Sequence, residues 1–371
     1  MSYSYWENKH WILNNDFIIV GSGIVGLTCA ISLNEKFPKS KILILEKGIL
    51  PEGASTKNAG FACFGSVSEL INDLKNHSNE EVFKLVSDRY NGLLTLRSLI
   101  GDKDLDYQNN FGYEIFLKKQ SFEKSYQKLN YLNELLNPLF KDDVFKVTEN
   151  KFNFKNCISK YIVNQFEGQL DPGRMISKLL NIAHQRKIKI LNQTLVKDYS
   201  ENQSNIQIHT NCGDFTSSKL IFATNGFSKN IINTNVIPAR GQVLITKPIK
   251  NLNIKGVFHL DKGYYYFRNV DYRILIGGGR NLDFQTESTN EFGKTELIQS
   301  SLKKLLNTVI IPEKEFEIDY SWSGIMGVGE KKKPIVKQLS NHVYCGVRLG
   351  GMGVALGAGV GSSLAELAMK A

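Results

Sequence analysis

The feature that most constrains this fold is a glycine pattern placed directly after a short apolar run. Residues 17–20 (Phe-Ile-Ile-Val) have the composition of a strand buried on both faces, and Gly21-x-Gly23-x-x-Gly26 follows without a spacer. Apolar residues then recur at helical spacing until a Phe-Pro-Lys-Ser stretch, and residues 42–45 form a second apolar run. The sequence therefore predicts one βαβ unit of about thirty residues.

Each glycine of the pattern has a physical role in a dinucleotide site. Gly21 permits a tight turn, Gly23 lets the backbone approach a pyrophosphate, and Gly26 lets the helix pack closely on the strand. The pyrophosphate would lie at the helix N-terminus. Glu46 ends the second strand 20 residues after Gly26, where its carboxylate can accept hydrogen bonds from both ribose hydroxyls and would repel a 2′-phosphate. These features predict an adenine dinucleotide other than NADP.

The segment after Glu46 indicates which dinucleotide is bound. Residues 53–60 read Gly-Ala-Ser-Thr-Lys-Asn-Ala-Gly. Here the chain resembles the D-amino acid oxidase-like family of FAD enzymes, which includes glycine oxidase, sarcosine oxidase and γ-glutamylputrescine oxidase. In that family a similar loop wraps the pyrophosphate and lies beside the flavin, so the resemblance implies bound FAD.

Further motifs in the family's order extend the resemblance over nearly the whole chain. They cover residues 168–172, 223–226, 238–242, 264–268, 276–279, 322–324 and 350–354. The resemblance implies that FAD is held by Gly21, Gly23, Ile24, Gly26, Glu46, Lys47, Ser55, Asn58, Ala59, Gly60, Val196, Ala223, Thr224, Gly226, Gly324, Gly350, Gly351, Met352, Gly353 and Val354.

The distribution of apolar residues predicts an α/β protein with two interleaved domains. One is a Rossmann-type FAD-binding domain, and the other is an α+β substrate domain built on a mostly antiparallel sheet, because β-branched and aromatic residues dominate residues 236–320. The apolar residues 354–368 predict a closing helix. We expect the FAD-binding domain to comprise residues 1–90, 160–235 and 321–371, and the substrate-binding domain to comprise residues 91–159 and 236–320.

The resemblance implies oxidation of the C–N bond of an amine or amino acid. A hydride would pass from the carbon beside a neutral amine to flavin N5, and water would hydrolyse the imine. Such a reaction needs orientation more than an acid–base pair, and the six histidines form no recognisable constellation, so no catalytic histidine is expected. A hydroxy-acid or polyol dehydrogenase, an RNA-modifying flavoprotein and a flavin-binding protein without turnover remain alternatives.

Departures from the family pattern bear on the substrate. Glycine oxidase-like members hold the substrate carboxylate with two arginines; the matching positions here are Met326 and Arg348. Arg280 is a possible replacement for the missing arginine, and Tyr264 could supply a hydroxyl to the substrate. The attachment cysteine and the oxygen-activating lysine of sarcosine oxidase-like members are both replaced. We therefore expect non-covalent FAD, with oxygen or another carrier as acceptor and oxygen as the poorer one.

Composition limits the remaining classes. The formal net charge is +10, but basic residues are spread along the chain, so nucleic-acid binding is not expected. Five cysteines without CxxC spacing predict reduced thiols and no metal site. Apolar runs far shorter than about 20 residues predict no transmembrane segment, while peripheral contact with a membrane stays open. The polar, aromatic start of the chain lacks a secretion signal, which favours a cytoplasmic location.

Overall fold

The first sheet begins with the predicted βαβ unit. In the computed structural model, which describes residues 3–203 and 205–370, β1 (Asn15–Val20) is followed by α2 (Ile24–Lys36) and β2 (Ile42–Leu45). β1 and β2 pair in parallel, and every residue of β2 is buried. The apolar runs are therefore central strands covered on both faces.

The first sheet continues on both sides of this unit. Its strand order is β17-β18-β11-β1-β2-β8, with β10 and β9 added in antiparallel fashion beside β11. The added strands are β8 (Lys189–Leu191), β9 (Val196–Glu201), β10 (Ile206–Thr210), β11 (Gly213–Phe222), β17 (Ile335–Gln338) and β18 (Val343–Val347). The parallel centre of this sheet is formed by strands that are far apart in the chain, which is the interleaving that the sequence predicts.

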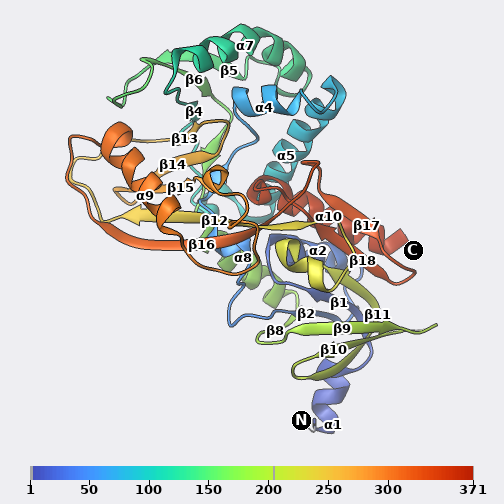
Figure 1. Ribbon diagram of the computed structural model, residues 1–371. Helices are drawn as coiled ribbons and strands as arrows, with labels where there is room; N and C mark the ends of the chain where they lie inside the picture. Colours follow the sequence, from blue (N-terminus) through green and yellow to red (C-terminus); the bar gives the residue numbers. More distant parts are fainter. Residues whose placement is uncertain (1–2, 204, 371) are drawn as a thin grey trace.

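The second sheet is mostly antiparallel and lies beside the first (Figure 1). Its order is β16-β12-β15-β14-β13-β4-β6-β5, with only β13 and β4 paired in parallel. The strands are β4 (Gly112–Glu114), β5 (Phe145–Glu149), β6 (Lys160–Asn164), β12 (Ile237–Thr246), β13 (Val257–Leu260), β14 (Tyr265–Val270), β15 (Arg273–Gly278) and β16 (Ile318–Val328). A two-stranded ladder joins β3 (Phe61–Ala62) to β7 (Gly168–Gln169).

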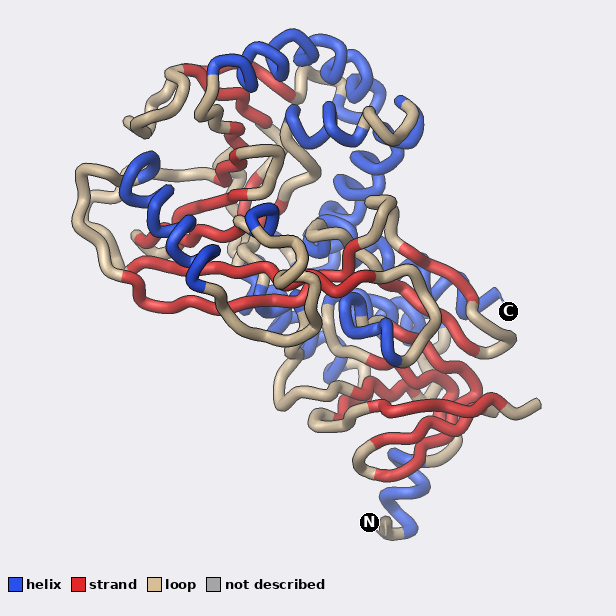
Figure 2. The backbone as a smooth tube through the Cα atoms, viewed as in Figure 1, coloured by secondary structure: helices blue, strands red, loops and turns tan. Residues whose placement is uncertain are grey.

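Helices cover both sheets, as the tube in Figure 2 shows. α7 and α4 lie over the outer part of the second sheet, and α9 lies along its other side (Figure 1). The helices are α1 (Tyr5–Glu7), α3 (Ala54–Lys57), α4 (Val67–Asp73), α5 (Asn79–Ile100), α6 (Asp102–Leu105), α7 (Lys119–Phe140), α8 (Pro172–Gln185), α9 (Glu296–Leu305) and α10 (Gly353–Lys370). In the described ranges, no helix has both the length and the apolar character needed to cross a membrane.

The strand membership differs from the expected domain boundaries in two places. β16 and β6 pair within the second sheet, although residues 321–328 and 160–164 were expected in the FAD-binding domain. β16 runs beside β12 over ten register positions, so it is an edge strand of the second sheet that leads back to the first. The pairing of these two strands therefore places residues 160–164 and 318–328 in the second sheet.

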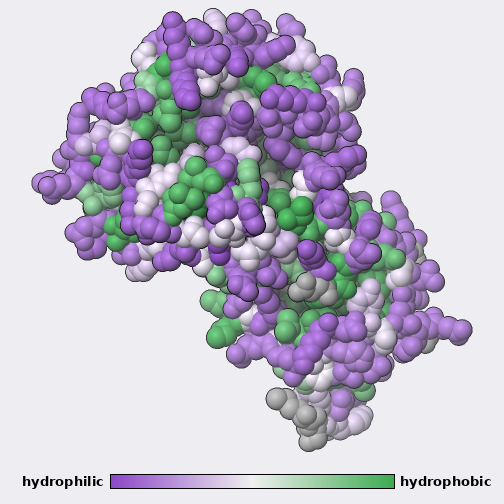
Figure 3. Space-filling view, viewed as in Figure 1, coloured by the Kyte–Doolittle hydropathy of each residue, from purple (hydrophilic) through white to green (hydrophobic). Residues whose placement is uncertain are grey.

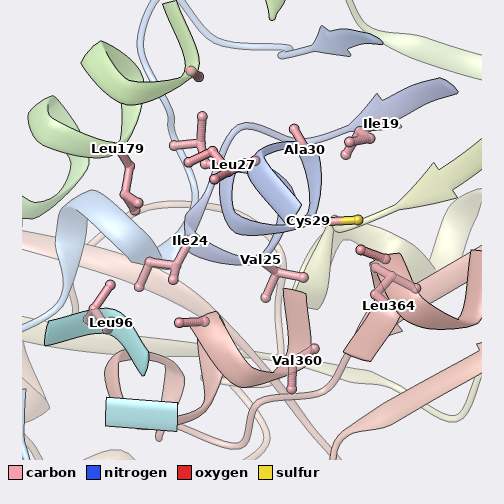
Figure 4. Packing of buried hydrophobic residues seen from close by; sticks show 14 of the residues in the cluster. Ile19, Ile24, Val25, Leu27, Cys29, Ala30, Leu96, Leu179, Val360 and Leu364 are labelled. Carbon is pink, nitrogen blue, oxygen red and sulfur yellow. The ribbon is translucent and has the colours of Figure 1, made fainter. Parts of the chain in front are cut away.

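The hydrophobic core beside the first sheet is built around α2, as Figure 4 shows. Leu27, Ala30 and Val25 pack against side chains of α5, α8 and α10, and Leu27 is fully buried. A buried leucine of this kind stabilises the fold by about 2 kcal/mol. The contact between α2 and α10 requires a glycine, because a Cβ at Gly361 would lie 1.9 Å from the Thr28 hydroxyl oxygen.

A buried arginine fixes the two sheets relative to each other. Arg268 of β14 donates hydrogen bonds to the main-chain oxygens of Ala59 and Leu170, which belong to segments beside the first sheet. On the face drawn in Figure 3, hydrophilic side chains cover most of the upper, α7 region, while hydrophobic ones gather nearer the middle. A large cavity lies between the two sheets, and its walls form the candidate site.

Candidate active site

The glycine turn forms one end of the cavity. Gly21 has a left-handed backbone (φ 104°), and its N–H donates to the Leu45 oxygen at 2.8 Å. A Cβ at Gly26 would lie 1.9 Å from the Gly21 oxygen, so α2 starts in direct backbone contact with the turn. The close approach leaves the N-terminus of α2 facing the cavity, in the geometry that favours a phosphate.

Glu46 lies at the end of β2, on the cavity wall, and is 5% exposed. Its Oε2 accepts hydrogen bonds from the Ser22 N–H (2.9 Å) and hydroxyl (2.7 Å), and its Oε1 accepts one from Gly48 N–H (3.1 Å). A carboxylate has about four acceptor positions, so one remains for a ribose hydroxyl. Glu46 thus both holds the glycine turn and offers an acceptor to a nucleotide.

The segment 53–60 lies against the start of α2. The Ser55 hydroxyl oxygen accepts from Ile24 N–H at 3.0 Å, and the Asn58 side chain accepts from Gly60 N–H at 2.8 Å. Trp322 of β16 donates its indole N–H to the Lys57 oxygen at 2.9 Å. The loop is therefore fixed from both sheets, in a position to cover a bound pyrophosphate.

The cavity has a volume of about 620 Å³ and reaches from the glycine turn to the second sheet. Most of the residues proposed to hold FAD lie on its wall: Gly21, Gly23, Ile24, Glu46, Lys47, Ser55, Asn58, Ala59, Val196, Ala223, Thr224, Gly324, Gly350, Gly351, Met352, Gly353 and Val354. An open glycine turn, a carboxylate with a spare acceptor position and largely apolar walls fit a flavin dinucleotide.

Three of the proposed contacts lie behind the wall. A Cβ at Gly60 would lie 2.2 Å from the Leu170 oxygen, and one at Gly226 would lie 2.5 Å from the Met326 oxygen. The third residue, Gly26, packs against the backbone of Gly21. These glycines allow segments of backbone to approach one another, so they shape the cavity without lining it.

Tyr264 and Arg280 lie on the wall at the far end of the cavity. Arg280 lies over the ring of Phe284, with 4.7 Å between its guanidinium carbon and the ring centroid, and the Tyr264 ring meets Phe284 edge to face. Within residues 3–203 and 205–370, neither the guanidinium nor the Tyr264 hydroxyl makes a hydrogen bond. Both groups therefore have open hydrogen-bonding positions, and their substrate roles stay predictions.

Arg348 occupies a different place from the one expected. It does not line the cavity; its guanidinium donates to the Lys333 oxygen (3.0 and 3.1 Å) and the Asn235 oxygen (3.3 Å). Its backbone is left-handed (φ 67°), and its N–H is held by Asn225 Oδ1. In this conformation the guanidinium is bound to main-chain carbonyls outside the cavity lining. Met326, at the other arginine position, does line the cavity.

A buried group of ionisable side chains also lies beside the cavity, and no sequence motif indicates it. His259 of β13 is 4% exposed, and its Nε2 lies 3.0 Å from Glu167 Oε2. Its Nδ1 lies 3.9 Å from Glu69 Oε2, and the Glu114 carboxylate also interacts electrostatically with the ring. His259, Glu69 and Cys63 all line the cavity. This grouping of a histidine with carboxylates is not visible in the sequence, and the expectation of no catalytic histidine stays a prediction.

The charges of this group set the protonation of His259. Burial disfavours the imidazolium, but the carboxylates of Glu167, Glu69 and Glu114 outweigh it and raise the pKa of His259 to about 9. Burial also raises the pKa of Glu114 to about 7, against the hydrogen bonds that Ser68 donates to it. The wall thus holds an imidazole that is protonated at neutral pH beside carboxylates.

Cys63, Glu167 and His259 bring one ligand atom each to within 4.8 Å of one another. A metal ion would need the Cys63 thiolate. Burial raises the pKa of that thiol well above its ordinary value, and nearby carboxylates add to the effect. In the metal-free protein the Cys63 thiol is therefore protonated.

Comparison with known proteins agrees with this geometry. The family model described as FAD dependent oxidoreductase (DAO) matches residues 16–367. The probable oxidoreductase OrdL of Haemophilus influenzae is 23% identical, over 95% of this chain and 82% of its own length.

Solved structures share the fold. L-proline dehydrogenase from P. horikoshii superposes with a TM-score of 0.78 and 18% identity, covering 97% of this chain and 94% of that one. Glycine oxidase from Bacillus cereus superposes with a TM-score of 0.78 and 16% identity, covering 96% and 97%. The chain belongs to the DAO family of FAD-dependent oxidoreductases.

Proposed function

We propose that this enzyme oxidises the C–N bond of an amino acid or related amine. The observation that supports this most is the pairing of opposite charges on one cavity wall. Arg280 offers a guanidinium without a hydrogen-bond partner among the described residues, and Glu69 offers a carboxylate; both residues line the cavity. A molecule with a carboxylate and an ammonium group matches both.

The wall suggests how the chain would hold such a substrate. Glu69 is close to Gly263, since a Cβ there would lie 2.6 Å from Glu69 Oε1, and Tyr264 is the next residue. Arg280 can bind a carboxylate through two parallel hydrogen bonds. Charge attraction at both ends fixes the carbon that bears the amine, which is the orientation that this reaction needs. Bound FAD supplies the electron acceptor, a flavin N5 that takes up a hydride.

The FAD is proposed to be bound without a covalent link. Residues 324–327 contain no cysteine, and the thiol of Cys63, which does line the cavity, is kept protonated by burial and is a poor nucleophile. Acid precipitation should release all of the yellow colour as FAD. Flavin retained in the protein pellet would contradict this part of the proposal.

A hydroxy-acid or polyol dehydrogenase is a second candidate. The observation that favours it is the His259–Glu167 pair, since oxidation of a C–O bond needs a base for the hydroxyl proton. The purified FAD-loaded protein should be mixed without oxygen with separate pools of amino acids, amines, hydroxy acids and polyols. We expect loss of the oxidised flavin absorbance with amino acids or amines. Loss with hydroxy acids or polyols alone would establish the second candidate instead.

A further inference from the structure

The buried His259–Glu167 pair has the geometry of a positioned base. Glu167 is 1% exposed, and its Oε1 accepts from Phe64 N–H (3.0 Å) and Gly65 N–H (3.2 Å), while its Oε2 faces His259 Nε2. These hydrogen bonds fix the carboxylate, and the carboxylate fixes the imidazole. Phe61 packs edge to face on the ring, with 5.5 Å between ring centroids.

The other ring nitrogen of His259, Nδ1, lies on the side of Glu69, a residue that also lines the cavity. Within the described residues, Nδ1 makes no hydrogen bond: the nearest carboxylate oxygen, of Glu69, is 3.9 Å away. The residues facing the ring are Glu69 of α4, Glu114 of β4, Cys63 after β3, Glu167 before β7 and Tyr266 of β14. Nδ1 therefore has an open hydrogen-bonding position beside a cavity-lining carboxylate, whereas Nε2 is occupied by Glu167.

We infer that His259 takes the proton from the substrate's ammonium group, with Glu167 as a positioning residue and Glu69 holding the ammonium by charge. The inference rests on the proposed function. In the step, the N–H bond of the ammonium breaks and the proton joins His259 Nδ1. The substrate carbon then gives its hydrogen with two electrons to FAD and becomes an iminium carbon, which water hydrolyses.

The surroundings match the two partners of this proton transfer. An ammonium group beside a carboxyl group loses its proton near the same pH as His259, whose pKa the carboxylates raise to about 9. Transfer between groups of similar pKa is close to balanced, so neither direction has a large barrier. Because the imidazole must be neutral to act, the rate should rise with pH, with its midpoint near pH 9.

Two measurements on FAD-loaded protein test this. The variants are His259→Gln, Glu167→Gln and the control His184→Gln, which alters an exposed histidine of α8. The first measurement is NMR of labelled histidine rings, in which the signal missing from His259→Gln identifies His259. The signal should titrate near pH 9 in the wild type and at clearly lower pH in Glu167→Gln. A titration near the ordinary 6.5 in the wild type would overturn the inference.

The second measurement is the limiting rate of flavin reduction without oxygen, from pH 6 to 10, with the best amine substrate. In the wild type this rate should rise in a step with its midpoint near pH 9. His259→Gln should lower it about 100-fold and remove the pH step, Glu167→Gln should move the step to lower pH, and His184→Gln should change neither. A His259→Gln variant with the wild-type rate and step would overturn the inference. Should that variant fail to fold, the shift in Glu167→Gln decides.

Failure of the inference is distinguishable from failure of the proposed function. If hydroxy acids reduce the flavin and no amine does, both the proposed function and the proton transfer from an ammonium group are contradicted. The NMR titration would still show whether Glu167 raises the pKa of His259. Amine reduction that is independent of His259 would leave the proposed function standing and remove the inference alone.

Discussion

The two ends of the cavity are held together by different kinds of interaction. At the nucleotide end, neighbouring residues in one βαβ unit make the site: backbone contacts of the glycine turn and a carboxylate that holds it. At the substrate end, side chains from α4, β13, β14 and the segments before β7 and after β15 meet on one wall. The first end depends on close backbone packing, whereas the second depends on the balance of buried charges.

We expect the largest loss of bound FAD from a substitution that adds a side chain at the glycine turn. Gly26→Ala places a Cβ 1.9 Å from the Gly21 oxygen, and a backbone atom cannot yield as a flexible side chain does. We expect the purified variant to retain essentially no FAD, measured as flavin absorbance per protein. The control is Gly173→Ala of α8, outside the cavity lining, whose Cβ would meet only Asp171 Oδ1, at 3.1 Å. Full flavin content in Gly26→Ala would show that the turn can relax.

A buried ion pair supports the wall that bears Arg280. Arg240 donates to Glu287 at 2.8 and 3.0 Å, and Gln242 donates to the same carboxylate. Burial opposes ionisation of Glu287, but these hydrogen bonds outweigh it and lower its pKa. Glu287→Gln leaves the Arg240 charge without its partner and should destabilise the protein by about 3 kcal/mol at neutral pH.

The pH dependence of this pair follows from the direction of the shift. Because the folded pKa is below the ordinary 4.5, the stabilisation is complete above that pH and is lost as pH falls through the lower folded value. Denaturant unfolding should show this acid-side loss in the wild type and a smaller one in Glu287→Gln. Equal stability of the two proteins at neutral pH would show that the pair contributes nothing net.

Glu46 tests the nucleotide end without crowding it. Glu46→Gln should weaken FAD retention and Glu46→Ala should weaken it further, by about 1.5 to 3 kcal/mol in total, or roughly ten- to a hundredfold. Fluorescence of released FAD during dilution measures the effect. The control is Glu35→Gln, because Glu35 is an exposed residue of α2 that pairs with Arg186. Unchanged FAD retention in both variants would show that Glu46 does not bind FAD and only accepts hydrogen bonds from Ser22 and Gly48.

The smallest effect sharpens the assignment of the arginines. Arg280→Lys keeps the charge and loses the planar fork, so half-maximal flavin reduction should need about tenfold more substrate, while FAD content stays the same. Arg348→Lys, whose guanidinium is bound to main-chain oxygens, should leave substrate dependence unchanged. The reverse result would return Arg348 to the substrate and remove Arg280 from it.

The same contrast explains what the sequence could predict. The strand, the glycine turn, α2 and Glu46 are adjacent in the chain, and their spacing reflects direct contacts. The family's motif order also predicted the two sheets. Glu69, Glu167 and His259 are separated by about a hundred residues each, and their meeting depends on how β3, β7 and β13 lie together. The spacing of residues in the sequence does not indicate such a contact. The Arg348 side chain starts from a left-handed backbone angle, which the nearby Gly346 and Gly350 do not predict.

The most direct test of C–N oxidation is product analysis of a single turnover without oxygen. Protein with a known amount of bound FAD is mixed with an excess of the best amine substrate, and the reduced flavin, the released ammonia or amine, and the carbonyl product are measured in the same sample. We predict one nitrogen compound and one carbonyl compound released for each FAD reduced. Flavin reduction with a carbonyl product and no released nitrogen would contradict the proposed function.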